Sequence, residues 1–271
     1  MEPYYEDAAV TLYCGDMREV LPALDVQADA IVADPPYGKE TSHDWDRWID
    51  GWPTLVSKCA NSMWCFGSSK MFGEHWGEFE EQWTYSHDIM WSKPRSAQFT
   101  KDRFRRSHEP AYHWYHGPWN QVYTNPQRVA YTGPDSRHGY RGRQPEHTGT
   151  INQRSWVDDG TRLMLSVIEA PTMWRRGQIH STEKSPEILT PLLSYAVPEG
   201  GLVLDPSAGS CSTLATARAL GMRAIGIERD EAMCEEAVRY RLARNLAPRP
   251  VPRAAAEHKK NSEFDLFGGA A

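Results

Sequence analysis

The groups best suited to chemistry follow a short apolar run at residues 30–33 (Ala-Ile-Val-Ala). Small and β-branched apolar residues predict a buried strand, and Pro35 and Pro36 end it because proline cannot donate to a sheet ladder. We therefore expect Asp34 and Tyr37 on a stiff turn at the carboxyl end of a strand. Open α/β sheets bind their ligands at that edge.

This turn can hold an aromatic amine. The carboxylate of Asp34 and the carbonyl of Pro35 can accept both hydrogens of an exocyclic amine, while the ring of Tyr37 stacks on the flat base that carries it. The alternative is an ordinary strand-to-turn boundary, with Asp34 accepting nearby backbone amides. The tetrapeptide alone leaves both interpretations open.

Asp-Pro-Pro-Tyr after an apolar strand resembles the catalytic motif of the S-adenosylmethionine-dependent DNA amino-methyltransferases, which act on adenine N6 or cytosine N4. The resemblance implies that Asp34, Pro35, Pro36 and Tyr37 form the catalytic group. It also implies that the target base is flipped out of the duplex and that the methyl group is transferred directly, without a covalent enzyme intermediate.

The rest of the first half alternates strands with helices. Residues 10–13, 62–66 and 86–91 are typical of strands, and residues 17–24 and 52–59 are typical of helices. This alternation predicts an α/β fold with a mostly parallel sheet. The resemblance makes it a Rossmann-like methyltransferase sheet.

A βαβ unit is expected between Gly200 and Glu228, with small residues in its first turn. Glu228 lies 23 positions after Asp205, close to the spacing at which nucleotide-binding folds place a carboxylate for ribose hydroxyls. The turn does not match the dinucleotide glycine fingerprint. It resembles the family's Asp-Pro-Phe-Ala-Gly-Ser-Gly, with Ser207 in place of Phe and Cys211 in place of the last Gly.

Two further segments resemble the family's cofactor site. Asp16 after Gly15 could be only a helix N-cap, but the family has a Gly-Asp here that contacts the cofactor adenine. Residues 180–185 (His-Ser-Thr-Glu-Lys-Ser) resemble His-Pro-Thr-Gln-Lys-Pro, whose polar groups help hold the cofactor's methionine part. The resemblance thus implies an S-adenosylmethionine site formed by Asp16, His180, Thr182, Lys184, Asp205, Pro206, Ala208, Gly209, Ser210 and Glu228.

The catalytic strand precedes the cofactor strand along the chain, which in the resembling family is the circularly permuted β order. An irregular stretch with turn signals separates the two halves, and such long irregular stretches tend to be functional. We expect a catalytic half at residues 1–116, a target-recognition insert at 117–178, a cofactor-binding half at 179–247 and a flexible C-terminal tail at 248–271.

The charge distribution favours a nucleic-acid partner. The formal net charge is −6, but residues 93–184 hold 15 Lys and Arg against 8 Asp and Glu. A solvated loop region could show such an excess by chance, whereas a DNA-binding face explains it directly. The side chains suited to phosphates or base edges are Arg137, Arg141, Arg143, Asn152, Gln153 and Arg154.

The sequence shows no pattern typical of a metal site, of disulfides or of a membrane segment. His108-Glu109 is a poor metal signature, and because the family has a similar His-Glu we interpret it as scaffold near the flipped base; no metal is expected. The five cysteines are scattered, as is typical of reduced thiols in a cytosolic protein. We expect a cytoplasmic protein encoded by a bacterium or a phage. No apolar run approaches the roughly 20 residues of a membrane span, and residues 1–7 are not a signal peptide.

Adenine is the favoured target, because the motif begins with Asp34 whereas cytosine-N4 enzymes more often carry Ser there. A cytosine-N4 enzyme is the first alternative, and a catalytically idle DNA-binding protein on the same scaffold is the second. A methyltransferase acting on RNA or a protein amide is a third, which the basic insert and the Asp disfavour.

The tail offers one further hypothesis. Its composition predicts a flexible tether, yet it ends with the apolar side chains of Phe264, Leu266 and Phe267. These residues could fold back onto the protein's own surface. Alternatively, they resemble the Gln-Leu-Asp-Leu-Phe peptide that binds the bacterial sliding clamp, with the contacts made by Glu263, Phe264, Asp265, Leu266 and Phe267.

Overall fold

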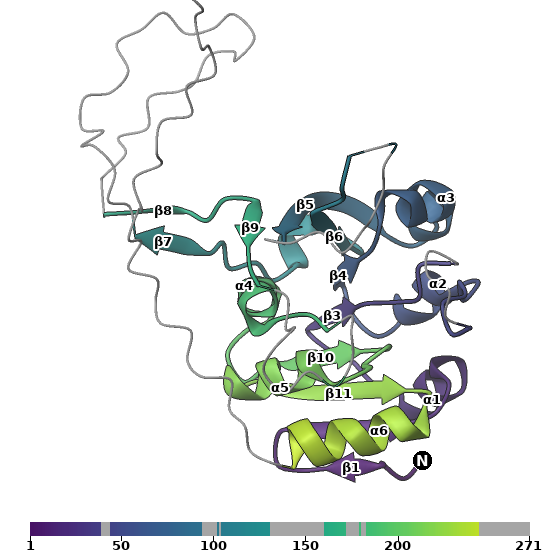
Figure 1. Ribbon diagram of the computed structural model, residues 1–271. Helices are drawn as coiled ribbons and strands as arrows, with labels where there is room; N and C mark the ends of the chain where they lie inside the picture. Colours follow the sequence, from purple (N-terminus) through teal and green to yellow (C-terminus); the bar gives the residue numbers. More distant parts are fainter. Residues whose placement is uncertain are drawn as a thin grey trace, which may run out of the picture. The chain divides into compact units, whose positions relative to one another are not determined.

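One nine-stranded sheet dominates the described part of the chain, with strand order β1-β2-β11-β10-β3-β4-β6-β5-β9 (Figure 1). The computed structural model describes residues 1–38, 44–93, 102, 104–130, 160–171, 179 and 183–243. The strands are β1 (Tyr5–Glu6), β2 (Val10–Cys14), β3 (Ala30–Ala33), β4 (Ser62–Phe66), β5 (Thr84–Ser92), β6 (His108–Tyr115), β9 (Val167–Glu169), β10 (Leu202–Asp205) and β11 (Arg223–Glu228).

Five neighbouring strands, β2, β11, β10, β3 and β4, run parallel to one another. β1 pairs antiparallel with β2 at one edge. Towards the other edge β6 is antiparallel to both β4 and β5, and β9 is parallel to β5. The sheet is therefore mostly parallel, as the alternation of strands and helices predicts.

The strand directions bring polar residues from distant segments to one edge of the sheet. Asp34 directly follows β3, while Asp205 and Glu228 end β10 and β11. Because β6 runs against its neighbours, its beginning lies at this same edge, and Glu109 there pairs with Trp91 near the end of β5. The carboxyl edge of the parallel strands thus gathers most of the candidate site.

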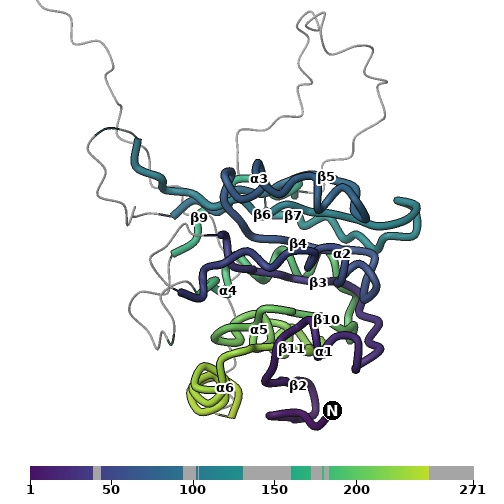
Figure 2. Tube along the Cα trace, turned by 90° about the vertical axis from the view of Figure 1, so that its right-hand side faces the viewer, coloured from purple at the N-terminus to yellow at the C-terminus, as the bar shows by residue number. Residues whose placement is uncertain are grey.

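Helices cover both faces of the sheet. α4, α5 and α6 lie on one side, and α1 and α2 lie on the other (Figure 2). Side-chain N-caps begin several of these helices. Asp16 accepts the backbone N–H of Arg18 at the start of α1, and Ser68 accepts that of Met71 at the start of α3. The helices are α1 (Met17–Leu24), α2 (Trp52–Val56), α3 (Ser69–Glu80), α4 (Pro186–Ala196), α5 (Ser212–Ala219) and α6 (Glu231–Ala237), with a short 3-10 helix η1 (Trp119–Gln121) and a π-helical turn η3 (Val238–Leu242).

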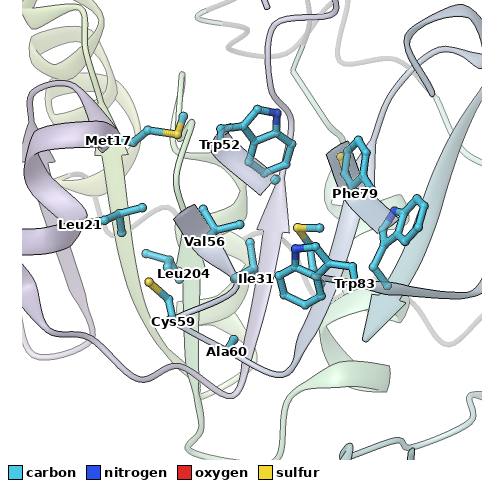
Figure 3. Packing of buried hydrophobic residues seen from close by; sticks show 14 of the residues in the cluster. Met17, Leu21, Ile31, Trp52, Val56, Cys59, Ala60, Phe79, Trp83 and Leu204 are labelled. Atoms are coloured by element: carbon cyan, nitrogen blue, oxygen red, sulfur yellow. The ribbon is translucent and has the colours of Figure 1, made fainter. Parts of the chain in front are cut away.

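A core of large side chains holds β3 against the helices. Trp52 and Val56 of α2 lie between Leu21 of α1 and Phe79 of α3, with Ile31 of β3 beside them (Figure 3). All five side chains are buried. Interiors pack as densely as organic crystals, so β3 has little freedom to move. The turn that follows it therefore begins from a fixed position.

A smaller unit contains the hairpin of β7 (Arg128–Ala130) and β8 (Thr161–Leu163), which pair antiparallel. Among the described residues this unit comprises 128–130 and 160–164, which lie within the insert expected at 117–178. On either side of it, β9 adds to the edge of the large sheet, and Asn125 donates its backbone N–H to the carbonyl of Tyr195 at 2.8 Å. The described flanks of that stretch are therefore ordered parts of the larger unit.

Several sequence-based predictions fall outside the described residues. They concern the six DNA-contact candidates Arg137, Arg141, Arg143, Asn152, Gln153 and Arg154, the cofactor candidates His180 and Thr182, and the tail motif at 263–267. Within the described residues, no helix combines the length and apolarity needed to cross a membrane. No cluster of His, Cys, Asp or Glu in this part of the chain is arranged to hold a metal ion.

Candidate active site

A buried carboxylate fixes the Asp-Pro-Pro-Tyr turn. The side chain of Asp46 accepts the backbone N–H of Tyr37 at 2.9 Å and that of Gly38 at 3.1 Å. Gly38 has a φ of 83°, a left-handed conformation that glycine adopts without strain. Trp48, two residues after Asp46, stacks on His75 of α3 and donates its indole N–H to Glu78. The loop that carries Asp46 is thus attached to α3.

Two carboxylates contact the Tyr37 hydroxyl, and two lysines pair with these carboxylates. This hydroxyl lies 2.9 Å from Asp34 Oδ1 and 2.9 Å from Glu109 Oε1. The ammonium group of Lys184 contacts Asp34 Oδ2 at 2.5 Å and Glu109 Oε1 at 3.1 Å. Lys93 donates to the other oxygen of Glu109. Two lysines and two carboxylates therefore balance each other around one phenol.

The pKa values in this cluster follow from burial and pairing. Burial raises the pKa of Asp34, Lys184 counteracts this, and Glu109 adds to the increase. Burial also opposes ionisation of Glu109, but Lys184 and Lys93 lower its pKa to about 2. For Lys184 the burial penalty is outweighed by Asp34 and Glu109, which raise its pKa. Lys184 is thus a cation and Glu109 an anion at neutral pH.

The second half of the site is the loop between β10 and α5. Asp34 donates its backbone N–H to the Ser207 hydroxyl in this loop at 3.3 Å. Glu228 accepts the backbone N–H of Gly209 at 2.9 Å and that of Asp230 at 2.7 Å. Ala208 donates its N–H to the carbonyl of Ile227. The loop is therefore fixed on one side to the catalytic turn and on the other to the end of β11.

Cys211 has a φ of 59°, in the left-handed region, and its side chain is buried. The resembling family has glycine at this position, which is the residue that adopts this conformation without a steric penalty. The chain therefore keeps a glycine-type backbone while carrying a thiol. Burial raises the pKa of that thiol, so it is not a poised nucleophile.

A cavity of about 410 Å³ joins these two halves. Ligand sites in proteins commonly have volumes of about 300–1,000 Å³. The cavity brings together twelve of the fourteen predicted catalytic and cofactor residues: Asp16, Asp34, Pro35, Pro36, Tyr37, Lys184, Asp205, Pro206, Ala208, Gly209, Ser210 and Glu228.

Comparison with known proteins identifies the family. A family model for N6/N4 methyltransferases, described as DNA methylase, matches residues 28–239. The chain belongs to this family. It is therefore a DNA methyltransferase of the N6/N4 type, and the family resemblance noted in the sequence is confirmed.

Solved structures share the fold of this DNA methyltransferase. The crystal structure of M1.HpyAVI has 18% sequence identity, a TM-score of 0.60, and coverage of 85% of this chain and 98% of that chain. The M1.HpyAVI–SAM complex has 20% identity, a TM-score of 0.59 and the same coverage. The PvuII DNA methyltransferase, described as cytosine-N4-specific, has 11% identity, a TM-score of 0.64, and coverage of 93% and 91%. The Rossmann-like α/β fold is thus confirmed.

A comparison with curated protein sequences found no match.

The structure of the methyltransferase places two predicted cofactor residues in additional contacts. Asp16 caps α1 and also pairs with the Arg18 guanidinium at 2.5 Å. Lys184, which the resemblance assigns to the cofactor's methionine part, directs its ammonium group to Asp34 and Glu109.

Three residues near the turn were not identified as site residues from the sequence. Asp46 and Lys93 were missed, and Glu109 was interpreted only as scaffold. A signal existed for Lys93, which follows the end of a strand as Asp34 does. No local pattern marks Asp46, which lies in a polar stretch with several other acids.

Proposed function

We propose that the protein transfers a methyl group from S-adenosylmethionine to the N6 amine of adenine in DNA. The methyl donor of this family is S-adenosylmethionine. One observation carries the proposal: the catalytic turn and the cofactor loop line the same cavity and are joined by the hydrogen bond from Asp34 to Ser207. An acceptor base held at Asp34 would therefore lie close to a donor held along the β10 loop.

The residues on the cofactor side of the cavity suit S-adenosylmethionine. Glu228 keeps acceptor capacity beyond the two backbone N–H groups it binds, because a carboxylate offers about four lone-pair sites. It can therefore accept ribose hydroxyls. Small residues at Ala208, Gly209 and Ser210 let the backbone approach the ligand closely. When bound, S-adenosylmethionine supplies an electrophilic methyl group on a sulfonium centre.

Asp34 and Tyr37 would hold the acceptor base. Adenine inside a duplex directs its amine at the partner base, so the base must be flipped out before it can enter the cavity. Asp34 is 28% exposed, so one side of its carboxylate is accessible. Accepting both N–H bonds at Asp34 and the Pro35 carbonyl would favour a pyramidal nitrogen with its lone pair directed at the methyl group. Catalysis then consists mainly of positioning and electrostatics.

Adenine is preferred over cytosine in this proposal because the motif begins with Asp34. The test is to incubate the purified protein with isotope-labelled S-adenosylmethionine and DNA, digest the DNA and separate the nucleosides by mass spectrometry. N6-methyladenine is the expected product. N4-methylcytosine would replace adenine by cytosine in the proposal, and cofactor binding without any methylated base would favour the idle DNA-binding protein.

The assignment of the DNA contacts remains part of this proposal. The basic segment around Arg141 and Arg143 is proposed to contact DNA phosphates or base edges, on the strength of its composition. The clamp-binding interpretation of residues 263–267 also remains a prediction, supported only by its similarity to the known peptide.

A further inference from the structure

Lys184 occupies an unusual position for a lysine. Its side chain is only 6% exposed, and its ammonium group lies between two carboxylates, one on the turn after β3 and one on β6. It also lies 5.0 Å from the ring centroid of Phe66. Burial of an unpaired ammonium would cost several kcal/mol, so the two carboxylates are needed for this placement.

The two carboxylates in turn need the lysine. Tyr37 has a single hydroxyl proton, so it can donate to Asp34 or to Glu109 but not to both at once. Lys93 neutralises the far oxygen of Glu109. Among the described residues, Lys184 is the cation that pairs with Asp34. Without it, Asp34 would face the buried carboxylate of Glu109 with no cation between the two.

The contacts that Lys184 and Tyr37 make with Asp34 also leave room for a substrate. Each carboxylate oxygen has about two lone pairs. Tyr37 occupies one on Oδ1 of Asp34, and Lys184 occupies one on Oδ2. One lone pair on each oxygen remains available to an incoming amine. The two contacts fix the plane of the carboxylate without blocking it.

We propose that Lys184 is a positioning residue for methyl transfer, which holds Asp34 as an oriented carboxylate so that Asp34 can accept an N–H of the target amine beside the Pro35 carbonyl. This inference rests on the proposed role of Asp34. It differs from the role that the sequence resemblance implies for Lys184, which is to hold the cofactor.

The expected effect of pH follows from the groups that face Asp34. These are Tyr37 on its own turn, Glu109 on β6, Lys184 before α4, Cys65 on β4 and Asp205 on β10. Burial and Glu109 raise the pKa of Asp34, and Lys184 is the main opposing charge. Removing Lys184 should therefore raise this pKa further. A protonated Asp34 is uncharged and carries an O–H donor, so it is a weaker acceptor for the N–H of the amine. Activity should therefore fall at neutral pH and recover as the pH rises.

The experiment compares K184M, K184R and the matched control K70M, which removes a lysine from the surface of α3. The turnover number is measured from mildly acidic to alkaline pH, with cofactor affinity and thermal stability of each variant. For K184M we expect the acidic limb to move to higher pH, with turnover on that limb falling about tenfold for each increase of about 1 in the pKa of Asp34, and largely retained cofactor affinity. K184R should keep the acidic limb at the parent's pH, and K70M should keep the whole profile.

A second variant protects the test against misfolding. In E109Q the removed charge is one that raises the pKa of Asp34, so its acidic limb should move to lower pH, opposite to K184M. NMR of an isotope-labelled Asp34 carboxyl gives the same comparison without turnover. An unshifted titration of Asp34 in K184M, or loss of cofactor affinity with an unchanged profile, would overturn the proposal. If the parent protein methylates no base, the proposed function fails, and the NMR titration still decides whether Lys184 keeps Asp34 ionised.

Discussion

The hydroxyl of Tyr37 lies 2.9 Å from Oε1 of Glu109, although 72 positions separate the two residues in the chain. The contact exists because β6 runs antiparallel to β4 and therefore begins at the edge where β3 ends. Glu109 is buried, and it contacts both lysines of the cluster. One reversed strand thus supplies the second carboxylate of the site.

The first prediction concerns Asp34. Replacing it with Ala removes the acceptor for the target amine, so turnover should fall roughly 100-fold or more while cofactor binding is largely kept. Methyl transfer and cofactor affinity are measured side by side. Asp50→Ala, at an exposed position of the following loop, is the matched control. Turnover of Asp34→Ala within severalfold of the parent would contradict the assigned role.

The second prediction separates the ring of Tyr37 from its hydroxyl. Tyr37→Phe keeps the stacking surface but removes the donor shared by Asp34 and Glu109. We expect a loss of about 1.5–3 kcal/mol in the free energy of unfolding, as is typical of a hydrogen bond to a charged group. Tyr37→Ala should have a lower turnover than Tyr37→Phe, because the stacking surface is also lost. Denaturant titration and turnover of both variants test this, and equal turnover of the two would exclude stacking.

The third prediction concerns the cofactor. Glu228→Gln retains an acceptor oxygen for Gly209 but removes the charge that would bind ribose hydroxyls. Cofactor affinity should weaken by about 1.5–3 kcal/mol, as is typical of a hydrogen bond to a charged group. Calorimetry is the direct measurement, with Glu236→Gln on the exposed side of α6 as the control. An unchanged affinity would reduce Glu228 to a loop-fixing residue.

The fourth prediction uses the backbone of Cys211. Both Cys211→Gly and Cys211→Ala remove the buried thiol, but only glycine relieves the left-handed conformation. The Gly variant should therefore be more stable than the Ala variant by about 1 kcal/mol. Thermal or denaturant unfolding of the pair measures this difference. A more stable Ala variant would show that this backbone conformation is not retained in solution.

The fifth prediction concerns DNA. Replacing Arg141 and Arg143 together with Ala should lower DNA affinity and reduce the slope of log affinity against log salt by about 0.9 for each lost phosphate contact. Titrations at several salt concentrations measure both quantities. Arg223→Ala, at the beginning of β11 and away from the carboxyl edge, is the control. A salt slope equal to the parent's would place the DNA face elsewhere.

The sequence predicted the sheet elements well where local signals are strong. Residues 30–33, 62–66 and 17–24 form the expected strands and helix with the expected bounds, because apolar runs and caps determine them locally. Helix α2 is shorter than predicted, since it ends at Val56. The motifs also identified twelve of the residues that line the cavity, but not Ser207, which joins its two halves.

Contacts between distant segments could not be predicted in this way. Lys184 is 150 positions from Asp34, and its ammonium group reaches that carboxylate only because the segment before α4 passes the end of β3. Similarly, the position of Lys93 beside Glu109 depends on the pairing of β5 with β6. These contacts follow from strand order, which no local pattern encodes.

The adjacency of β3 and β10 has a consequence for how the chain folds during synthesis. Asp29, just before β3, accepts the backbone N–H of Leu202, which begins β10, and Val203 pairs with Ala30. β2 likewise pairs with β11. β2 and β3 thus leave the ribosome long before β11 and β10 exist, and the edges that pair with these late strands need protection from other chains during that time. We expect the centre of the sheet to close last, so a nascent chain cut before Leu202 should aggregate or be held by chaperones.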